Sequence, residues 1–329
     1  LSLIEIRKEG RMPVKVVKNL PAIEQLRADN IFVMDSERAE QQNIRPLNLL
    51  IVNLMPRKMV TETQILRLLS NTPLQINVDL LYPSSHVVKN TQQSYLDSFY
   101  QSFSEVRAKY YDGLIITGAP LEQMAFEAVD YWLEFLEIIE WSKRHVYSTL
   151  HICWGAQAGL YARYGITKQQ LPQKVCGVFK STVENHRHPL FRGFDDYFSF
   201  PHSRYTACAE EQIRILDDFE ILSHSQHAGL GIVAKKNLRE IYLFGHLEYD
   251  RETLEWEYQR DKAAGLTAVR PQNYFPEDDE QQPPVKTWAS AASLFFSNWL
   301  NYAVYQATPY VGERLSSHYE EDYDFNQAE

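Results

Sequence analysis

The segment Val146–Leu160 constrains the fold of this chain more than any other part of the sequence. Its apolar first half, Val146–Ile152, has the composition of a buried strand and stops abruptly at Cys153. Small residues at helical spacing follow at once, beginning Trp154-Gly155-Ala156. A strand that turns so sharply into a helix predicts a nucleophile elbow, in which the turn lifts the Cys153 side chain clear of a sheet.

Similar alternation of strand and helix fills the first half of the chain. It predicts strands at Leu47–Leu54, Ile76–Tyr82 and Gly113–Thr117, and helices at Thr61–Leu69 and Phe126–Trp141. This order favours an α/β fold with a parallel sheet flanked by helices on both faces. Active groups in such sheets lie at the carboxyl ends of strands, where Asn53, Gly118 and Cys153 all fall.

The second half is predicted to be more mixed, with some antiparallel strands. Strand-like runs lie at Cys176–Val183, Phe219–Leu222, Gly229–Ala234 and Ile241–Phe244. Helical patterns lie at Leu254–Lys262 and Trp288–Tyr305. No linker or internal repeat interrupts residues 12–310, so we expect a single domain there. Residues 1–11 are interpreted as an upstream extension, because Met12-Pro13 resembles a natural start, and residues 311–329 as an acidic tail.

Composition excludes several classes of protein. The 329 residues, 44% of them hydrophobic, are typical of a globular protein with a large core. A net charge of −10 argues against broad nucleic-acid binding, and no apolar run reaches the length of a membrane span. Three widely spaced cysteines, Cys153, Cys176 and Cys208, indicate neither a metal site nor disulfides. We therefore expect a cytoplasmic protein without a metal.

Cys153, His246 and Glu248 are candidates for nucleophilic catalysis. A free cysteine is most often a core residue and a lone histidine is most often structural. At an elbow, however, the helix N-terminus favours a thiolate. His246 follows an apolar run, and Glu248, two residues on, shares its face of an extended backbone. Together they predict acyl transfer through a thioester, with Glu248 orienting the imidazole.

Other polar or glycine positions have two interpretations each. The N–H groups of Gly118 and Trp154 would form an oxyanion hole, although Gly118 also suits an ordinary turn. Arg57 and Lys58 suit a solvated loop, the commoner case, or a site for phosphates of a cofactor such as coenzyme A. The aromatic residues of Trp288–Tyr305 suit the core or a dimer face. His151 and His202 are expected to be structural.

Five motifs, in order, resemble the homoserine O-acyltransferases of bacterial methionine biosynthesis, a branch related to class I glutamine amidotransferases. They are Asn53–Gln64 (NLMPRKMVTETQ), Thr117–Pro120 (TGAP), Leu150–Leu160 (LHICWGAQAGL), Phe200–Arg204 (FPHSR) and Gly245–Tyr249 (GHLEY). The resemblance covers residues 12–310 and implies a flavodoxin-like core with a Cys153-His246-Glu248 triad. It also implies a substrate pair, L-homoserine and an acyl-coenzyme A, with no permanently bound cofactor. We expect the protein to form a homodimer.

The resemblance also assigns residues to the substrates. By matching positions, Lys174, Ser203 and Arg260 would contact substrate, and a guanidinium at 260 suits the carboxylate of an amino acid. The alternative for Lys174 and Arg260 is solvated surface charge. In this family, glutamate at the position of Glu122 goes with acetyl-coenzyme A and glycine with succinyl-coenzyme A. A carboxylate there would repel that of succinate, at about 1–3 kcal/mol, so we expect acetyl transfer.

Three alternatives stay open from the sequence. The donor could be succinyl-coenzyme A, although Glu122 speaks against it. The same triad could serve a glutamine-hydrolysing subunit of a larger synthetase. Amidotransferases usually have glycine two residues before the nucleophile, however, and His151 stands there. The chain could also be a binding protein that retains the fold, with an ordinary unreactive thiol at Cys153.

Overall fold

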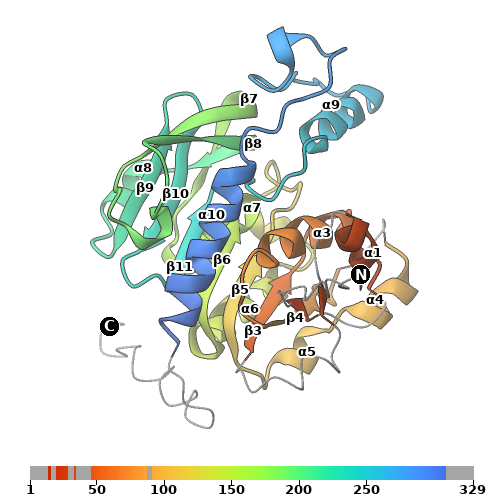
Figure 1. The fold of residues 1–329 in the computed structure, drawn as a ribbon, viewed down its shortest axis with the longest axis vertical. Coiled ribbons are helices and arrows are strands. Elements are labelled where there is room, and N and C mark those ends of the chain that lie inside the picture. Colours follow the sequence, from red (N-terminus) through yellow and green to blue (C-terminus); the bar gives the residue numbers. More distant parts are fainter. Residues whose placement is uncertain (1–13, 16–19, 29–32, 35–45, 87–90, 309–329) are drawn as a thin grey trace, which may run out of the picture.

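An eleven-stranded sheet organises the part of the chain that the computed structural model describes, residues 14–15, 20–28, 33–34, 46–86 and 91–308. The predicted extension and acidic tail lie outside these residues. The strands are β1 (Val14–Lys15), β2 (Val33–Met34), β3 (Leu47–Val52), β4 (Ile76–Leu81), β5 (Tyr111–Ile116), β6 (Val146–Ile152), β7 (Lys168–Val183), β8 (Tyr197–Cys208), β9 (Phe219–Ser225), β10 (Gly229–Lys235) and β11 (Glu240–Leu243). Their spatial order is β2-β1-β4-β3-β5-β6-β11-β10-β9-β7-β8 (Figure 1).

The sheet divides into a parallel half and an antiparallel half. Every pairing from β2 to β11 is parallel, whereas β11, β10, β9, β7 and β8 pair antiparallel. In the parallel half, Val52 lies opposite Ile116, and Leu243 lies opposite Ile152. The carboxyl ends of β3, β5, β6 and β11 are therefore level, at one edge of the sheet. The predicted parallel core with a mixed second half is confirmed.

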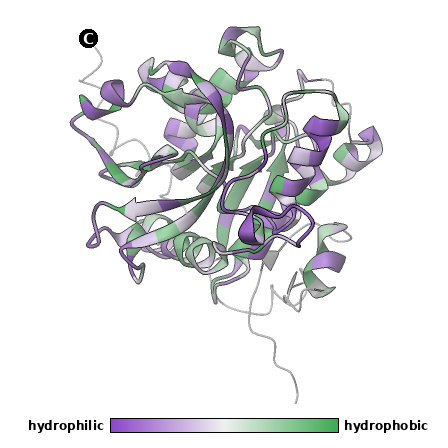
Figure 2. Ribbon diagram, turned by 90° about the horizontal axis from the view of Figure 1, so that it is seen from above, coloured by the Kyte–Doolittle hydropathy of each residue, from purple (hydrophilic) through white to green (hydrophobic). Residues whose placement is uncertain are grey.

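Helices pack on both halves of the sheet and cover both faces of the parallel half. They are α1 (Ala22–Ala28), α3 (Lys58–Leu69), α4 (Gln93–Phe99), α5 (Phe103–Val106), α6 (Trp132–His145), α7 (Trp154–Tyr164), α8 (Glu210–Arg214), α9 (Thr253–Ala263) and α10 (Ala289–Asn298), with short turns η1 (Phe126–Ala128), η2 (Pro189–Phe191) and η3 (Pro276–Asp278) and a π-helical end η4 (Trp299–Tyr305). Alternate residues of β3 face opposite layers: Leu49 and Ile51 pack with α1, α3 and α10, and Leu50 and Val52 with α6. Figure 2 shows the hydrophobic strands at the centre of the molecule.

Several elements differ from the prediction, and β7 begins at Lys168, before the predicted start at Cys176. The helix expected at Phe126–Trp141 is interrupted, because η1 ends at Ala128 and α6 begins only at Trp132. The helix expected at Trp288–Tyr305 continues from α10 as π-helical η4. Trp288, Phe295, Phe296 and Trp299 are buried in the core, whereas Tyr305 is exposed. β8 was not predicted, since Pro201 interrupts its pattern; it lies at the sheet edge, where proline is tolerated. Among the described residues, no helix is long and apolar enough to span a membrane.

Candidate active site

Cys153 occupies the sharp turn that the sequence predicts between β6 and α7. Its backbone has φ 51° and ψ −111°, a conformation that residues other than glycine rarely adopt, and α7 starts at the next residue. The Cys153 N–H donates to the Leu243 carbonyl at 2.7 Å, which ties the turn to β11. A Cβ at Gly155 would lie 2.6 Å from the Thr117 carbonyl oxygen, so glycine lets α7 pack directly against the end of β5. These contacts hold the elbow in its strained shape.

Three neighbouring strand ends bring Gly118, Cys153 and His246 together. Gly118 follows β5, Cys153 follows β6 and His246 follows β11. A Cβ built on Gly118 would lie 3.4 Å from Cys153 Cβ and 3.4 Å from His246 Cε1. Trp154 is the first residue of α7, so its N–H belongs to the unpaired N-terminal group of that helix. The two N–H groups expected to bind an oxyanion thus lie next to the thiol.

His246 is oriented by a carboxylate and by an aromatic ring. Its Nδ1 lies 2.6 Å from Oε1 of Glu248, and both side chains are buried. The Tyr249 ring stacks on the imidazole with 4.0 Å between centroids. The Tyr249 hydroxyl in turn donates to Glu257 at 2.7 Å. With Nδ1 engaged by Glu248, Nε2 is the nitrogen left to exchange a proton with the thiol.

Electrostatics around His246 favour its charged form. Burial by itself lowers the pKa of the imidazolium, but the Cys153 sulfur and the Glu248 carboxylate outweigh it. The net result is a pKa for His246 well above its ordinary value. An imidazolium at neutral pH stabilises a thiolate beside it, which is the nucleophilic form of cysteine.

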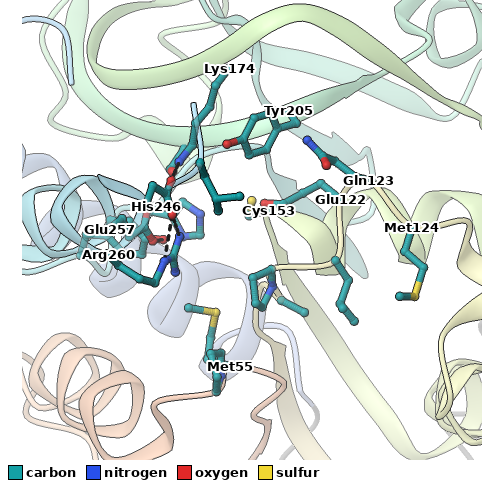
Figure 3. Close-up of a pocket in the computed structure, with 18 of the residues that line it drawn as sticks. Met55, Glu122, Gln123, Met124, Cys153, Lys174, Tyr205, His246, Glu257 and Arg260 are labelled. Carbon is teal, nitrogen blue, oxygen red and sulfur yellow. Dashed lines mark hydrogen bonds and ion pairs between the residues drawn. The ribbon is translucent and has the colours of Figure 1, made fainter. Parts of the chain in front are cut away.

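Cys153 and His246 line a cavity of about 780 Å³ (Figure 3). One wall is the segment Ala119–Met124, and Met55 lies on the opposite side from Lys174 and Tyr205. The sequence analysis singled out several of its lining residues, namely Glu122, Cys153, Lys174, Ser203, His246 and Arg260. It did not single out Tyr205, Tyr249, Glu257 or Asp261. Two of these residues could have been found from the sequence. Tyr249 is the last residue of the GHLEY motif, and Glu257 lies one helical turn before Arg260, so both side chains are on one face of the helix.

An acidic side chain joins the two predicted substrate-binding cations. Lys174 Nζ donates to Asp261 Oδ2 at 2.9 Å, and Arg260 donates to Asp261 Oδ1 at 2.7 and 3.0 Å. Lys174 is buried, with 4% of its side chain exposed, so the alternative of a solvated surface lysine is wrong. Arg260 is 57% exposed, and its guanidinium reaches the cavity from α9 (Figure 3). Both cations lie at the end of the cavity that also contains Glu257.

Comparisons with known proteins agree with this geometry. Residues 13–310 match the family model described as homoserine O-succinyltransferase. The chain belongs to this family of acyltransferases. A Lactococcus lactis subsp. lactis protein named homoserine O-acetyltransferase is 70% identical over 97% of this chain and 99% of its own length. A Streptococcus gordonii protein of the same name is 58% identical over 92% and 96%.

Solved structures show the fold independently of the sequence family. A glutamine amidotransferase from Thermotoga maritima superposes with a TM-score of 0.54 at 12% identity, covering 79% of this chain and 99% of that one. The expected amidotransferase-like fold is therefore confirmed.

His151 stands where amidotransferases usually have glycine, and its ring needs space between α7 and the sheet. A Cβ at Gly159 would lie 2.6 Å from His151 Nδ1, and the ring stacks on Tyr242 at 4.6 Å. Gly159 on α7 thus makes the space that the bulky residue requires.

Glu122 lies in the cavity wall and points toward Cys153 (Figure 3). Burial raises the pKa of its carboxyl, and the nearby charge of Glu257 raises it further. His246 and Lys174 act in the opposite direction. The position expected to select the acyl donor therefore faces the nucleophile and lies within electrostatic range of the cationic end of the cavity.

Arg57 and Lys58 have different environments, and neither interpretation from the sequence fits both. Lys58 is buried, so the solvated-loop interpretation is wrong for this residue; its Nζ donates to the Asn53 carbonyl at 2.6 Å. Burial lowers the pKa of Lys58 to about 8. Asn53 donates to the Tyr100 hydroxyl at 2.8 Å. Arg57 is exposed, with its guanidinium 4.8 Å from the centre of the Trp256 ring.

His202 lies behind the catalytic candidates, on β8. Its ring is fully buried, 4.8 Å from the ring of Phe200. Burial, and then the charge of Arg204, hold the pKa of His202 well below its ordinary value. A neutral ring in an aromatic environment fits the structural role that the sequence analysis expected for His202.

Proposed function

We propose that this protein is a homoserine O-acetyltransferase, which passes an acetyl group from acetyl-coenzyme A through a Cys153 thioester to the hydroxyl of L-homoserine. The observation that carries the proposal is the junction at Gly118, where the strained Cys153 turn and the His246 ring both lie against one glycine at the cavity wall. Family membership supports acyl transfer to homoserine, and the relatives named homoserine O-acetyltransferase support acetyl as the group transferred. No permanently bound cofactor enters the proposal.

The first half-reaction loads the enzyme. The Cys153 thiolate, paired with the His246 imidazolium, attacks the thioester carbonyl of acetyl-coenzyme A. The Gly118 and Trp154 N–H groups receive the oxyanion, helped by the positive end of the α7 dipole. The carbon–sulfur bond to coenzyme A then breaks, and the departing thiolate takes the proton that His246 holds. This leaves an acetyl group on Cys153 and a neutral imidazole.

The second half-reaction transfers the acetyl group. The neutral His246 takes the proton from the homoserine hydroxyl as its oxygen attacks the thioester, and the imidazolium with the Cys153 thiolate is restored. Arg260 is suited to bind the homoserine carboxylate through its planar guanidinium. Glu257 offers a carboxylate of the charge that an ammonium group requires, in the same part of the cavity. Lys174 and Ser203 complete the polar end of the site.

Glu122 supports acetyl over succinyl transfer. A carboxylate beside the nucleophile would meet the carboxylate of a succinyl group in a partly buried cavity, where like charges repel more strongly than in water. A short acetyl group has no such conflict. The Lactococcus and Streptococcus relatives are named as acetyltransferases, which agrees with this choice. The family as a whole is described as homoserine O-succinyltransferase.

Intact-protein mass spectrometry tests the proposal directly. We expect the mass of one acetyl group on the wild-type protein after mixing with acetyl-coenzyme A, and a much smaller succinyl adduct from succinyl-coenzyme A. Cys153→Ser should remove the hydroxylamine-labile thioester, and added homoserine should discharge it in the wild type. Faster loading by succinyl-coenzyme A would refute the donor. Ammonia release from glutamine, without loading by either donor, would instead indicate an amidotransferase.

A further inference from the structure

Lys168 is a cation next to the active site that the mechanism above does not use. It is the first residue of β7 and is not itself a lining residue of the cavity. Its ammonium donates to the Glu122 carbonyl at 2.7 Å and to the Met124 carbonyl at 2.5 Å. One side chain from a distant strand therefore binds the main chain at two points around Glu122.

An aromatic anchor completes this attachment. The Lys168 ammonium lies 4.2 Å from the centre of the Phe126 ring, an arrangement that attracts a cation to the ring face. Phe126 is buried and stacks on Trp132 at 5.3 Å and on Tyr161 at 4.8 Å. The wall is thus fixed to the core at Phe126 and to β7 through Lys168. Leu121 also packs against the core, and the Lys168 bonds fix the main chain at Glu122 itself and at Met124.

The charge of Lys168 also bears on Glu122. The ammonium is half-buried beside the wall and lies within electrostatic range of the Glu122 carboxylate. Without Lys168, the carbonyls of Glu122 and Met124 would lose a charge-assisted hydrogen bond. The wall would also lose the positive charge beside it. Both changes would allow the Glu122 carboxylate to move away from its position beside Cys153.

We propose that Lys168 is a positioning residue for acyl-donor selection, which acts by holding the wall that carries Glu122 through its two carbonyl contacts. The inference rests on the proposed function, because it concerns the choice between two acyl-coenzyme A donors. Lys168 touches neither donor and takes no part in proton transfer. It determines where the Glu122 carboxylate lies, and Glu122 in turn excludes a longer, charged acyl group.

The test compares donors in Lys168→Met, which keeps the length of the side chain but has no donor group and no charge. We expect its preference for acetyl- over succinyl-coenzyme A, as a ratio of kcat/KM values, to fall at least about tenfold. The KM for homoserine should stay within about twofold of wild type. Lys168→Arg retains the charge and can bind two carbonyls, so it should restore most of the preference. Lys235→Met is the matched control, since Lys235 also lies near an aromatic ring, that of Tyr164, but far from the cavity.

Hydrogen–deuterium exchange provides a readout that does not depend on activity. Peptides covering residues 119–126 should exchange faster in Lys168→Met than in wild type or Lys235→Met, with the rest of the protein unchanged. An unchanged donor ratio, or equal losses with both donors that Lys168→Arg does not rescue, would overturn the role in selection. Unchanged exchange would overturn the attachment itself. If the wild type transfers neither acyl group to homoserine, the proposed function fails, while the exchange experiment still decides whether Lys168 holds the wall.

Discussion

At the scale of single residues, the reactivity of Cys153 depends on how strongly Glu248 favours the imidazolium of His246. The Glu248 carboxylate lies 2.6 Å from Nδ1 and is one of the two groups that raise the pKa of His246. Glutamine at 248 keeps the size and one hydrogen-bonding oxygen but removes the charge. The imidazolium then loses part of its stabilisation, and the thiolate beside it becomes rarer at neutral pH.

Glu248→Gln should therefore slow the alkylation of Cys153 by iodoacetamide at pH 7 by roughly tenfold or more. The measurement is the alkylation rate from about pH 5 to about pH 10, at intervals of about one pH unit. Peptide mapping then identifies which cysteine has been alkylated. Cys176 and Cys208 are internal controls, because burial raises the pKa of each thiol to about 12. Glu134→Gln, a surface carboxylate bound to Ser84 and Ser85, is the matched variant. The same profile for wild type and Glu248→Gln would contradict this account of the triad.

At the scale of elements, two glycines of α7 should differ sharply in their tolerance of alanine. A Cβ at Gly155 would lie 2.6 and 2.9 Å from the carbonyl oxygens of Thr117 and Ile116, so the start of the helix must move away from β5. Gly165 ends the same helix with φ +67° and has open space around it. Alanine there has only the backbone strain to overcome.

Gly155→Ala should lower the melting temperature and reduce kcat/KM by at least about a hundredfold, since displacing the turn moves the nucleophile from its oxyanion donors. Gly165→Ala should lose about 1 kcal/mol of stability and keep its activity. Thermal melting and steady-state kinetics on both variants make the comparison. Equal behaviour of the two variants would mean that the packing of α7 on β5 does not fix the elbow.

At the scale of the whole molecule, buried neutral histidines make the fold sensitive to acid. Burial lowers the pKa of His151 to about 3, and that of His202 falls well below 6.5. Below pH about 6.5 the unfolded chain binds protons at these sites while the folded protein does not. The stability that they contribute is present above that pH and is lost as the pH falls toward the folded pKa.

His151→Phe should flatten this dependence by about 1.4 kcal/mol per pH unit below pH about 6.5. Urea unfolding at a series of pH values measures the slope, and Phe is chosen because it retains a ring to stack on Tyr242. His227→Phe, at an exposed turn, is the control. A slope equal to that of wild type would show that protonation of His151 does not drive the acid transition.

The sequence by itself determined the main strands of the parallel core and the turn that carries Cys153. Apolar runs of strand length and the glycine pattern after Cys153 are local properties, so β3, β5, β6 and the elbow followed from them. Because parallel strands end level, the positions of Gly118 and Cys153 at one sheet edge also followed. The apolar run before His246 and the His-x-Glu spacing made His246 and Glu248 candidate partners of Cys153, and the resemblance to a family implied the same triad.

Only the tertiary structure decided which charged residues are buried and what they hold. Lys58 and Lys174 were expected to suit solvated surface positions, yet both are buried. The partner of Lys174 is Asp261, which only folding brings to it, whereas Lys58 is bound by the carbonyl of nearby Asn53 once the turn after β3 has formed. Lys168 meets the Glu122 carbonyl across 46 residues, and edge strand β8 forms only because β7 lies beside it. Local pattern cannot specify such partners, since the energy of a buried charge depends on groups that folding brings to it.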